Sequence, residues 1–179
     1  MTDIKQLDSR IVYRNKWMTV REDRILRSSG NEGIFGVVDK PDFVVIVPVQ
    51  DGYIHLVEQY RYPVAGRYWE LPQGSWESDQ QADHLQIAAG ELREETGLSA
   101  GTMVYVGFQY LAYGYSSQGY HIYFATELAH SGNNLDSEEE DLITRKVPLR
   151  DFETMLSEGS IKDATTLAAY SLAKLKGLL

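Results

Sequence analysis

Three glutamates on one predicted helix constrain this chain more than any other feature of its sequence. Glu91, Glu94 and Glu95 stand at positions i, i+3 and i+4, a spacing that places all three carboxylates on one helical face. Like charges at these separations destabilise a helix by about 0.2–0.5 kcal/mol per pair, a cost that a bound cation removes. Hard divalent ions such as Mg2+ prefer oxygen ligands of this kind. The spacing indicates a cation site, with a solvated acidic face as the alternative.

The helix that carries the glutamates is predicted over residues 83–96. Apolar residues recur at three- and four-residue steps, and a glycine suited to a C-terminal cap follows them. The predicted buried face is formed by Leu85, Ala88, Ala89 and Leu92, and the capping residue is Gly97.

Short apolar and aromatic runs before this helix predict strands. Residues 11–27 mix β-branched, aromatic and charged side chains, which is typical of one or two half-exposed strands. Gly30, Gly33 and Gly36 then interrupt the pattern. Residues 43–49 form an apolar run typical of a buried strand, and Asp51-Gly52 predicts a hairpin turn into a partner strand over residues 53–60.

The same patterns continue through the rest of the chain. We expect further strands over residues 68–71, 103–108, 121–126 and 143–147, and helices over residues 149–157 and 163–175. Gly159 and Gly177 follow the two helices as stop signals. This order of elements predicts an α+β fold with a mixed sheet.

The net charge of the chain limits the kinds of molecule that it can bind. The chain has 26 acidic and 17 basic residues and a net charge of −9, and a surface of this sign repels nucleic-acid backbones and other polyanions. A phosphorylated substrate would therefore need metal ions to bridge it to the protein. The alternative is that the acidic charge only keeps the protein in solution.

Residue usage limits the metal ligands and the location. The chain has no cysteine, so a metal ion must be held by oxygen or histidine ligands, and the four histidines show no zinc-ligand spacing. No stretch approaches the roughly 18 apolar residues of a membrane span, and the N-terminus lacks the apolar core of a secretory signal. We expect a soluble, cytoplasmic protein with no membrane or nucleic-acid partner.

The glutamate segment and the residues before it resemble the Nudix box, G-x5-E-x7-R-E-U-x-E-E-x-G-U, in which U is aliphatic. Gly74 opens the match, Glu91, Glu94 and Glu95 take the glutamate positions, and Gly97 takes the final glycine. Two features depart from the pattern. Glu91 stands 17 positions after Gly74 instead of 15, which leaves Glu77 as the nearest candidate for the early glutamate. Gly90 also replaces the arginine of the pattern.

Segments outside the box resemble the branch of the Nudix family that hydrolyses ADP-ribose and related nucleoside-diphosphate sugars. They are residues 54–63, 69–72, 147–149 and 161–166. The resemblance implies an α/β/α sandwich with a mixed sheet, preceded by an antiparallel N-terminal strand segment. It also implies two regions: a dimerisation arm over residues 1–40 and a hydrolase domain over residues 41–179. The expected partner is a second copy of the chain.

The resemblance further implies the residues of the site. Glu91, Glu94 and Glu95 would hold two or three Mg2+ or Mn2+ ions, with the Gln73 carbonyl and Glu140 as further ligands. Glu138 or Glu140 would activate the attacking water, so that these five glutamates form the catalytic set. The expected substrate contacts are Arg61, Arg67, Trp69 and Glu70.

Two alternatives to an ADP-ribose hydrolase stay open. Gly90 and the longer loop favour a Nudix-fold sensor that binds a nucleotide sugar without hydrolysing it. A tyrosine within residues 110–116, where related ADP-ribose hydrolases usually carry proline, keeps other nucleoside-diphosphate sugars, dinucleoside polyphosphates and capped RNA ends as possible substrates.

Overall fold

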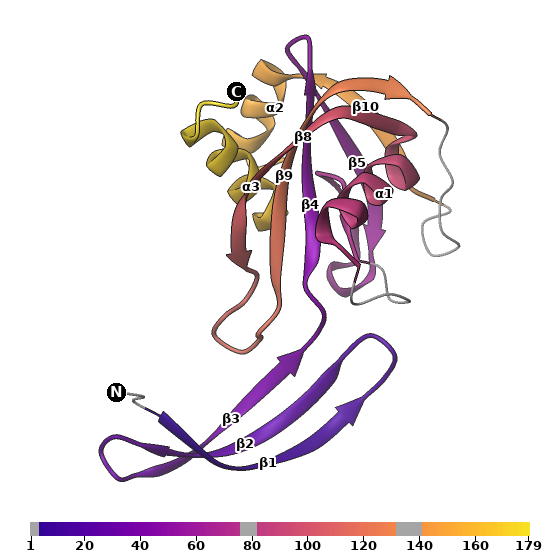
Figure 1. Ribbon diagram of the computed structural model, residues 1–179. Coiled ribbons are helices and arrows are strands. Elements are labelled where there is room, and N and C mark those ends of the chain that lie inside the picture. The colour runs from indigo at the N-terminus through magenta and orange to yellow at the C-terminus, as the bar shows by residue number, and fades with distance from the viewer. Residues whose placement is uncertain (1–3, 76–81, 132–140) are drawn as a thin grey trace. The chain divides into compact units, whose positions relative to one another are not determined.

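A computed structural model describes residues 4–75, 82–131 and 141–179 (Figure 1). The chain divides into two compact units. The first contains Met1–Asp42 with Gln109–Tyr120, and the second contains Phe43–Phe108 with His121–Leu179.

The first unit is built on a three-stranded antiparallel sheet in the order β1-β2-β3. Its strands are β1 (Ile4–Arg14), β2 (Thr19–Arg27) and β3 (Glu32–Asp39). The expectation that glycines interrupt the chain after residue 27 was wrong, because β3 pairs with β2 along its whole length. Ladder hydrogen bonds use backbone groups alone, so Gly33 and Gly36 are compatible with this strand.

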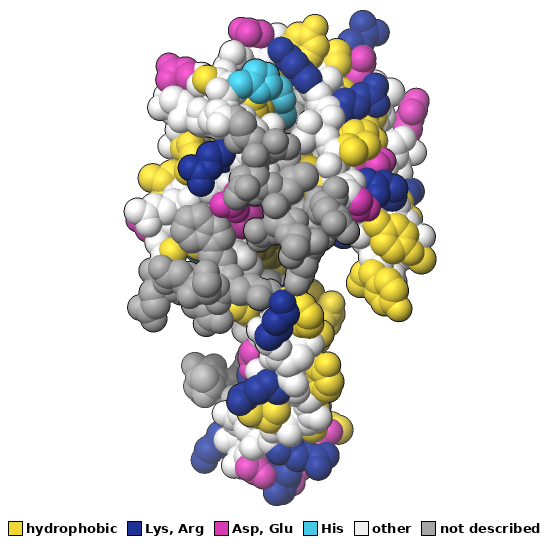
Figure 2. Space-filling view, turned by 90° about the vertical axis from the view of Figure 1, so that its right-hand side faces the viewer, with side chains coloured by type: hydrophobic (Ala, Val, Ile, Leu, Met, Phe, Trp, Pro, Cys, Tyr) yellow, Lys and Arg dark blue, Asp and Glu magenta, His cyan; other side chains and the backbone are white. Residues whose placement is uncertain are grey.

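Hydrophobic side chains on this sheet are unusually exposed. Every residue of β1 is exposed, and only Asp23 and Ile25 are buried in the three strands. Figure 2 shows hydrophobic side chains on the surface of this unit among charged ones. The exposed large hydrophobics of the three strands and their turns are Ile4, Leu7, Ile11, Val12, Tyr13, Trp17, Ile34 and Phe35.

The second unit contains a sheet of seven strands. The main path runs β10-β5-β4-β9-β8, while β6 pairs with β5 and β7 pairs with β4. The strands are β4 (Phe43–Gln50), β5 (Tyr53–Arg61), β6 (Gly66–Glu70), β7 (Gln73–Gly74), β8 (Leu98–Tyr110), β9 (Gly119–His130) and β10 (Ile143–Pro148). A short 3-10 turn, Tyr62–Val64, joins β5 to β6.

Helices cover both faces of this sheet (Figure 1). They are α1 (His84–Thr96), α2 (Leu149–Ser157) and α3 (Ala164–Leu175). Val44 and Ile46 of β4 pack in one cluster with Leu92 of α1, whereas α3 also contacts β4. Because successive side chains of a strand point to opposite faces, β4 is buried from both sides. The predicted α+β class with a mixed sheet is confirmed.

Capping at both ends explains the limits of α1. The Asp83 side chain accepts a hydrogen bond from the Leu85 N–H at 2.8 Å, which satisfies a backbone donor that the first turn leaves open. Gly97 ends the helix with φ +69°, and its N–H donates to the Arg93 carbonyl at 2.9 Å. The predicted helix and its capping glycine are therefore confirmed.

The buried face of α1 differs from the predicted one. Leu85 is 43% exposed and Ala89 is also exposed. The buried residues are Ile87, Ala88, Gly90, Glu91, Leu92 and Glu95. The buried face includes the carboxylates of Glu91 and Glu95, which a pattern of apolar residues does not assign to the interior. The helix is therefore rotated about its axis relative to the prediction.

Three further differences concern the strands: β1 begins at Ile4, before the predicted start at residue 11, β7 was not predicted, and β8 and β9 are longer than expected. The remaining predicted elements agree with the structure to within a few residues. In the part of the chain that the structure describes, no helix is long and apolar enough to cross a membrane.

The rotation of α1 is testable by two leucine substitutions on the same helix. Leu92→Ala removes a side chain that is 0% exposed and should lower the free energy of unfolding by about 2–5 kcal/mol. Leu85→Ala, the matched control on the exposed side, should change it by no more than about 0.5 kcal/mol. Urea unfolding of both variants measures the difference, and equal losses would contradict the observed orientation.

Candidate metal centre

The three glutamates of α1 lie in different environments. Glu95 is 0% exposed and Glu91 is 6% exposed. Glu94 is partly exposed, and its carboxylate lies 4.0 Å from the guanidinium of the exposed Arg93. Two of the three carboxylates therefore belong to the interior of the second unit. Burying charges of the same sign together is costly unless cations or hydrogen-bond donors compensate them.

Both buried carboxylates contact the two-residue strand β7. The Gln73 N–H donates to Glu95 Oε2 at 3.0 Å. A Cβ at position 74 would lie 2.5 Å from Glu91 Cδ, so only glycine lets this carboxylate approach the backbone so closely. Pairing of Gly74 with Val44 and of Gln73 with Val45 fixes β7 on the sheet. This explains why a glycine opens the motif.

The donor set fits a hard divalent cation. All the candidate side-chain ligands are carboxylates, and α1 and β7 bring Glu91 and Glu95 to one place. Among the described residues, no three acidic or histidine side chains gather closely enough to hold a metal ion by themselves. Mg2+ typically uses one or two carboxylates and completes its octahedron with water and substrate phosphates, so the arrangement suits such an ion.

The ligand roles of all these residues stay predictions. Glu138 and Glu140, and Glu77 as the candidate for the early glutamate of the motif, lie outside the described residues. The role of the Gln73 carbonyl is likewise untested, although the position of Gln73 beside Glu95 is compatible with it.

Arg61 and Glu70, two of the predicted substrate contacts, form an ion pair. The Arg61 Nη2 group donates to Glu70 Oε1, and Nε donates to Oε2 at 3.3 Å. Burial raises the pKa of the Glu70 carboxyl, and the Arg61 charge partly offsets this effect. The Arg61 side chain is 39% exposed, so the ion pair is only partly covered on the arginine side.

Arg67 joins two strands to the end of the predicted acidic loop. Its Nε donates to Glu58 Oε2 at 2.9 Å, and its Nη2 donates to the Asp141 carbonyl at 2.7 Å. A further ion pair links Arg67 to the Asp141 carboxylate. Asp141 follows Glu138 and Glu140 in the chain, and these contacts hold Asp141 itself on β5 and β6.

Trp69 is half-buried on β6, and the Arg145 guanidinium lies 5.9 Å from its ring centroid. This contact is compatible with either packing or nucleotide binding. The predicted substrate roles of Arg61, Arg67, Trp69 and Glu70 thus stay predictions.

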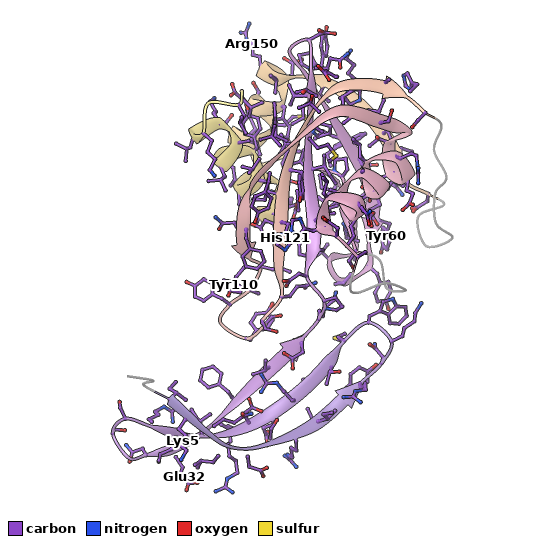
Figure 3. The ribbon with its side chains drawn as sticks, viewed as in Figure 1. Lys5, Glu32, Tyr60, Tyr110, His121 and Arg150 are labelled. Atoms are coloured by element: carbon purple, nitrogen blue, oxygen red, sulfur yellow. The ribbon has the colours of Figure 1, made fainter. Side chains whose placement is uncertain are left out.

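One cluster of side chains could not be found from sequence spacing. His84, at the start of α1, stacks on His121 of β9 with ring centroids 4.1 Å apart. His121 is labelled in Figure 3. Tyr105 and Tyr123 surround the pair. The contact joins residues far apart in the chain, so no spacing of histidines in the sequence indicates it.

Comparisons with protein families identify the class. Residues 39–170 match the NUDIX domain, and residues 4–38 match the nucleoside diphosphate sugar hydrolase N-terminal domain. The chain therefore belongs to the Nudix family, as the resemblance predicted.

Individual relatives indicate the branch of the Nudix family to which the chain is similar. The chain is 30% identical to an ADP-ribose pyrophosphatase of Mycobacterium tuberculosis over 93% of this chain and 81% of that protein. It is 28% identical to an ADP-ribose pyrophosphatase of Bacillus subtilis, over 80% and 77% of the two chains. It is also 23% identical to the methanol dehydrogenase activator of Bacillus methanolicus, over 98% and 95%.

A solved structure supports the fold. The crystal structure of an ADP compounds hydrolase superposes with a TM-score of 0.87 and covers 99% of this chain and 97% of that one, at 23% identity. The predicted Nudix fold, with its additional N-terminal antiparallel sheet, is confirmed.

The close approach of Gly74 to Glu91 predicts a sensitive position. Gly74→Ala adds a methyl group against the Glu91 carboxylate and should displace it, lowering affinity for Mn2+ by about 10-fold or more. The control is Gly36→Ala, where an added Cβ meets nothing within 4 Å. Calorimetric titration with Mn2+ checks both variants. Wild-type affinity in Gly74→Ala would show that Glu91 is not held against β7 for metal binding.

Proposed function

We propose that this protein hydrolyses the pyrophosphate bond of ADP-ribose, or of a related nucleoside-diphosphate sugar, to a nucleoside monophosphate and a sugar phosphate. The observation that carries the proposal is the pair of buried carboxylates, Glu91 and Glu95, held against β7 in a Nudix domain. Relatives named ADP-ribose pyrophosphatases support the choice of substrate.

The proposed cofactor is Mg2+ or Mn2+, with two or three ions held by Glu91, Glu94 and Glu95 and completed by Glu140 and the Gln73 carbonyl. When bound, these ions would neutralise the pyrophosphate and lower the pKa of a water molecule. The protein's own contribution is to fix the carboxylates beforehand. The Gln73 N–H sets the direction of one Glu95 oxygen, and the bare backbone at Gly74 sets the position of Glu91.

Proton transfer is assigned to the acidic segment after β9. Glu138 or Glu140 would accept a proton from the water as its oxygen attacks one phosphorus and the bridging P–O bond breaks. Arg67, bonded to Asp141, would hold the end of this segment near β5 and β6. Arg61, whose side chain is partly exposed, would bind a phosphate or ribose oxygen through its guanidinium.

Charge supports a small substrate. With a net charge of −9, the chain is poorly suited to a long phosphate backbone, and cations would offset the repulsion of a single pyrophosphate. A cysteine-free chain also fits the cytoplasm, which we propose as the location.

The substrate proposal is tested by a panel assay. The protein is incubated with Mg2+ and ADP-ribose, sugar nucleotides or dinucleoside polyphosphates, and phosphate is released from the products by a phosphatase. We expect the highest kcat/KM with ADP-ribose. Tight binding of one compound without turnover of any would instead identify a sensor.

Glu95→Gln tests the assignment of the ligand. Because loss of a neighbour of a metal ligand typically costs 10–100-fold, we expect loss of the ligand itself to lower kcat by at least about 100-fold. Glu158→Gln, the same change at an exposed site after α2, should leave kcat unchanged. Near-wild-type turnover of Glu95→Gln would exclude Glu95 from the ligand set.

We also propose that the protein is a homodimer and that residues 1–40 form the dimerisation arm. The support is the exposed apolar surface of the N-terminal sheet, since patches of this kind commonly mark interfaces.

Sedimentation velocity tests the dimer with a double variant of β1. Ile11→Asp and Val12→Asp together replace two exposed apolar side chains of this strand by charged ones and should convert a dimer to a monomer. The control Arg150→Asp changes an exposed residue of α2 (Figure 3) and should remain dimeric. A wild-type protein that sediments as a monomer at micromolar concentration would contradict the proposal.

A further inference from the structure

A buried threonine, Thr166, connects helix α3 to residues 71–74, which precede α1 in the chain. The Thr166 hydroxyl accepts a hydrogen bond from the Leu71 N–H at 2.9 Å and donates one to Asp163 Oδ2 at 2.8 Å. Thr166 is 0% exposed. A hydroxyl that both donates and accepts has a fixed orientation, and its loss would leave the buried Leu71 N–H unsatisfied.

The Asp163 carboxylate accepts hydrogen bonds both from the first turn of α3 and from Gln73. It caps α3 by accepting from the N–H groups of Thr165 at 3.2 Å and Thr166 at 2.8 Å. Its Oδ2 also accepts from Gln73 Nε2 at 3.2 Å. A helix cap needs only the first set of bonds, so the contact with Gln73 is additional to the capping role.

The other end of the same segment contacts the proposed metal ligands. Gln73 donates its N–H to Glu95, and Gly74 lies against Glu91. Between the two ends, the Pro72 carbonyl accepts from the Ile46 N–H at 2.9 Å. Residues 71–74 are thus bonded to α3, to β4 and to α1, and a shift at the α3 end would reach the carboxylates through three residues of backbone.

We propose that Thr166 and Asp163 are positioning residues for the metal centre. They hold residues 71–74 so that the backbone of Gln73 and Gly74 fixes Glu95 and Glu91. This inference rests on the proposed role of these glutamates as metal ligands. Groups that orient metal ligands typically contribute 10–100-fold to metal affinity, and we expect an effect of that size here.

The test measures Mn2+ affinity of the full-length protein from the EPR signal of the free ion, without substrate. Thr166→Val keeps the shape but removes the hydroxyl, and it should weaken Mn2+ binding by about 10-fold or more. Thr166→Ser keeps the hydroxyl and should restore wild-type affinity. Gln73→Met removes the hydrogen bonds of this side chain to Asp163 and Glu70 without altering the sequence of α3. It should also weaken binding, including in the case that Thr166→Val does not fold.

A control separates positioning from general loss of stability. Tyr170→Phe, on the same helix, removes the 2.8 Å hydrogen bond from the Tyr170 hydroxyl to Glu153 and leaves the contacts of residues 71–74 in place. It should bind Mn2+ as the wild type does. Equal weakening in Tyr170→Phe, or unchanged affinity in both Gln73→Met and Thr166→Val, would overturn the proposal. A wild-type protein that binds no Mn2+ would overturn it as well.

Hydrolysis of ADP-ribose, measured separately, distinguishes this inference from the proposed function. Turnover by the wild type with unchanged Mn2+ affinity in the variants would refute the positioning role alone. No turnover of any substrate, with weakened Mn2+ binding in Thr166→Val and Gln73→Met, would refute the function and support the positioning role.

Discussion

The second unit depends on how it accommodates two buried carboxylates on one helix. Glu91 and Glu95 lie one turn apart in the interior, where unpaired charge is strongly unfavourable. Strand β7 contacts both carboxylates. The Gln73 N–H donates to Glu95, and Gly74, which has no side chain, lets the Glu91 carboxylate lie close to the backbone. Because β7 has only two residues, it needs support from β4 and from the α3 end of residues 71–74. The contacts of residues 71–74 with α1, β4 and α3 thus serve to hold the two carboxylates in place.

Arg61 of β5 and Arg67 of β6 also pair with carboxylates, but in different environments. Arg61 pairs with the buried Glu70, and burial outweighs this pairing in its effect on the Glu70 pKa. Arg67 instead bonds groups at the surface, including Asp141 at the end of the acidic segment. One arginine therefore compensates an interior charge and the other connects surface segments. Such a division suits a strongly acidic chain, because each cation offsets carboxylates that would otherwise repel one another.

Local signals in the sequence were sufficient for the helices, for most of the strands and for the glutamate motif. Gly97 marked the end of α1 because the left-handed conformation there favours glycine. The helix face was misjudged because hydrophobic periodicity assigns a carboxylate such as Glu95 to solvent, and tertiary contacts with β7 override that preference. β3 was missed because its partner strand, more than its own residues, stabilises it. The bond between Leu71 and Thr166 spans 95 positions, and no local pattern records it.

The two units differ in what stabilises them. The second unit buries apolar side chains on both sides of β4, whereas the polar contacts of the first include Arg21 with Asp39 at 2.7 Å and Ser117 with Asp39 at 2.9 Å. Each such bond contributes only about 0.5–1.5 kcal/mol net, and small isolated sheets are marginally stable in water without a packed hydrophobic face. The three strands of the first unit leave many apolar side chains of β1 to β3 exposed, so the unit gains little stability from burying them. In the proposed dimer, the order of this unit should therefore depend on association more than that of the second unit, which would link assembly to the local stability of the N-terminal sheet.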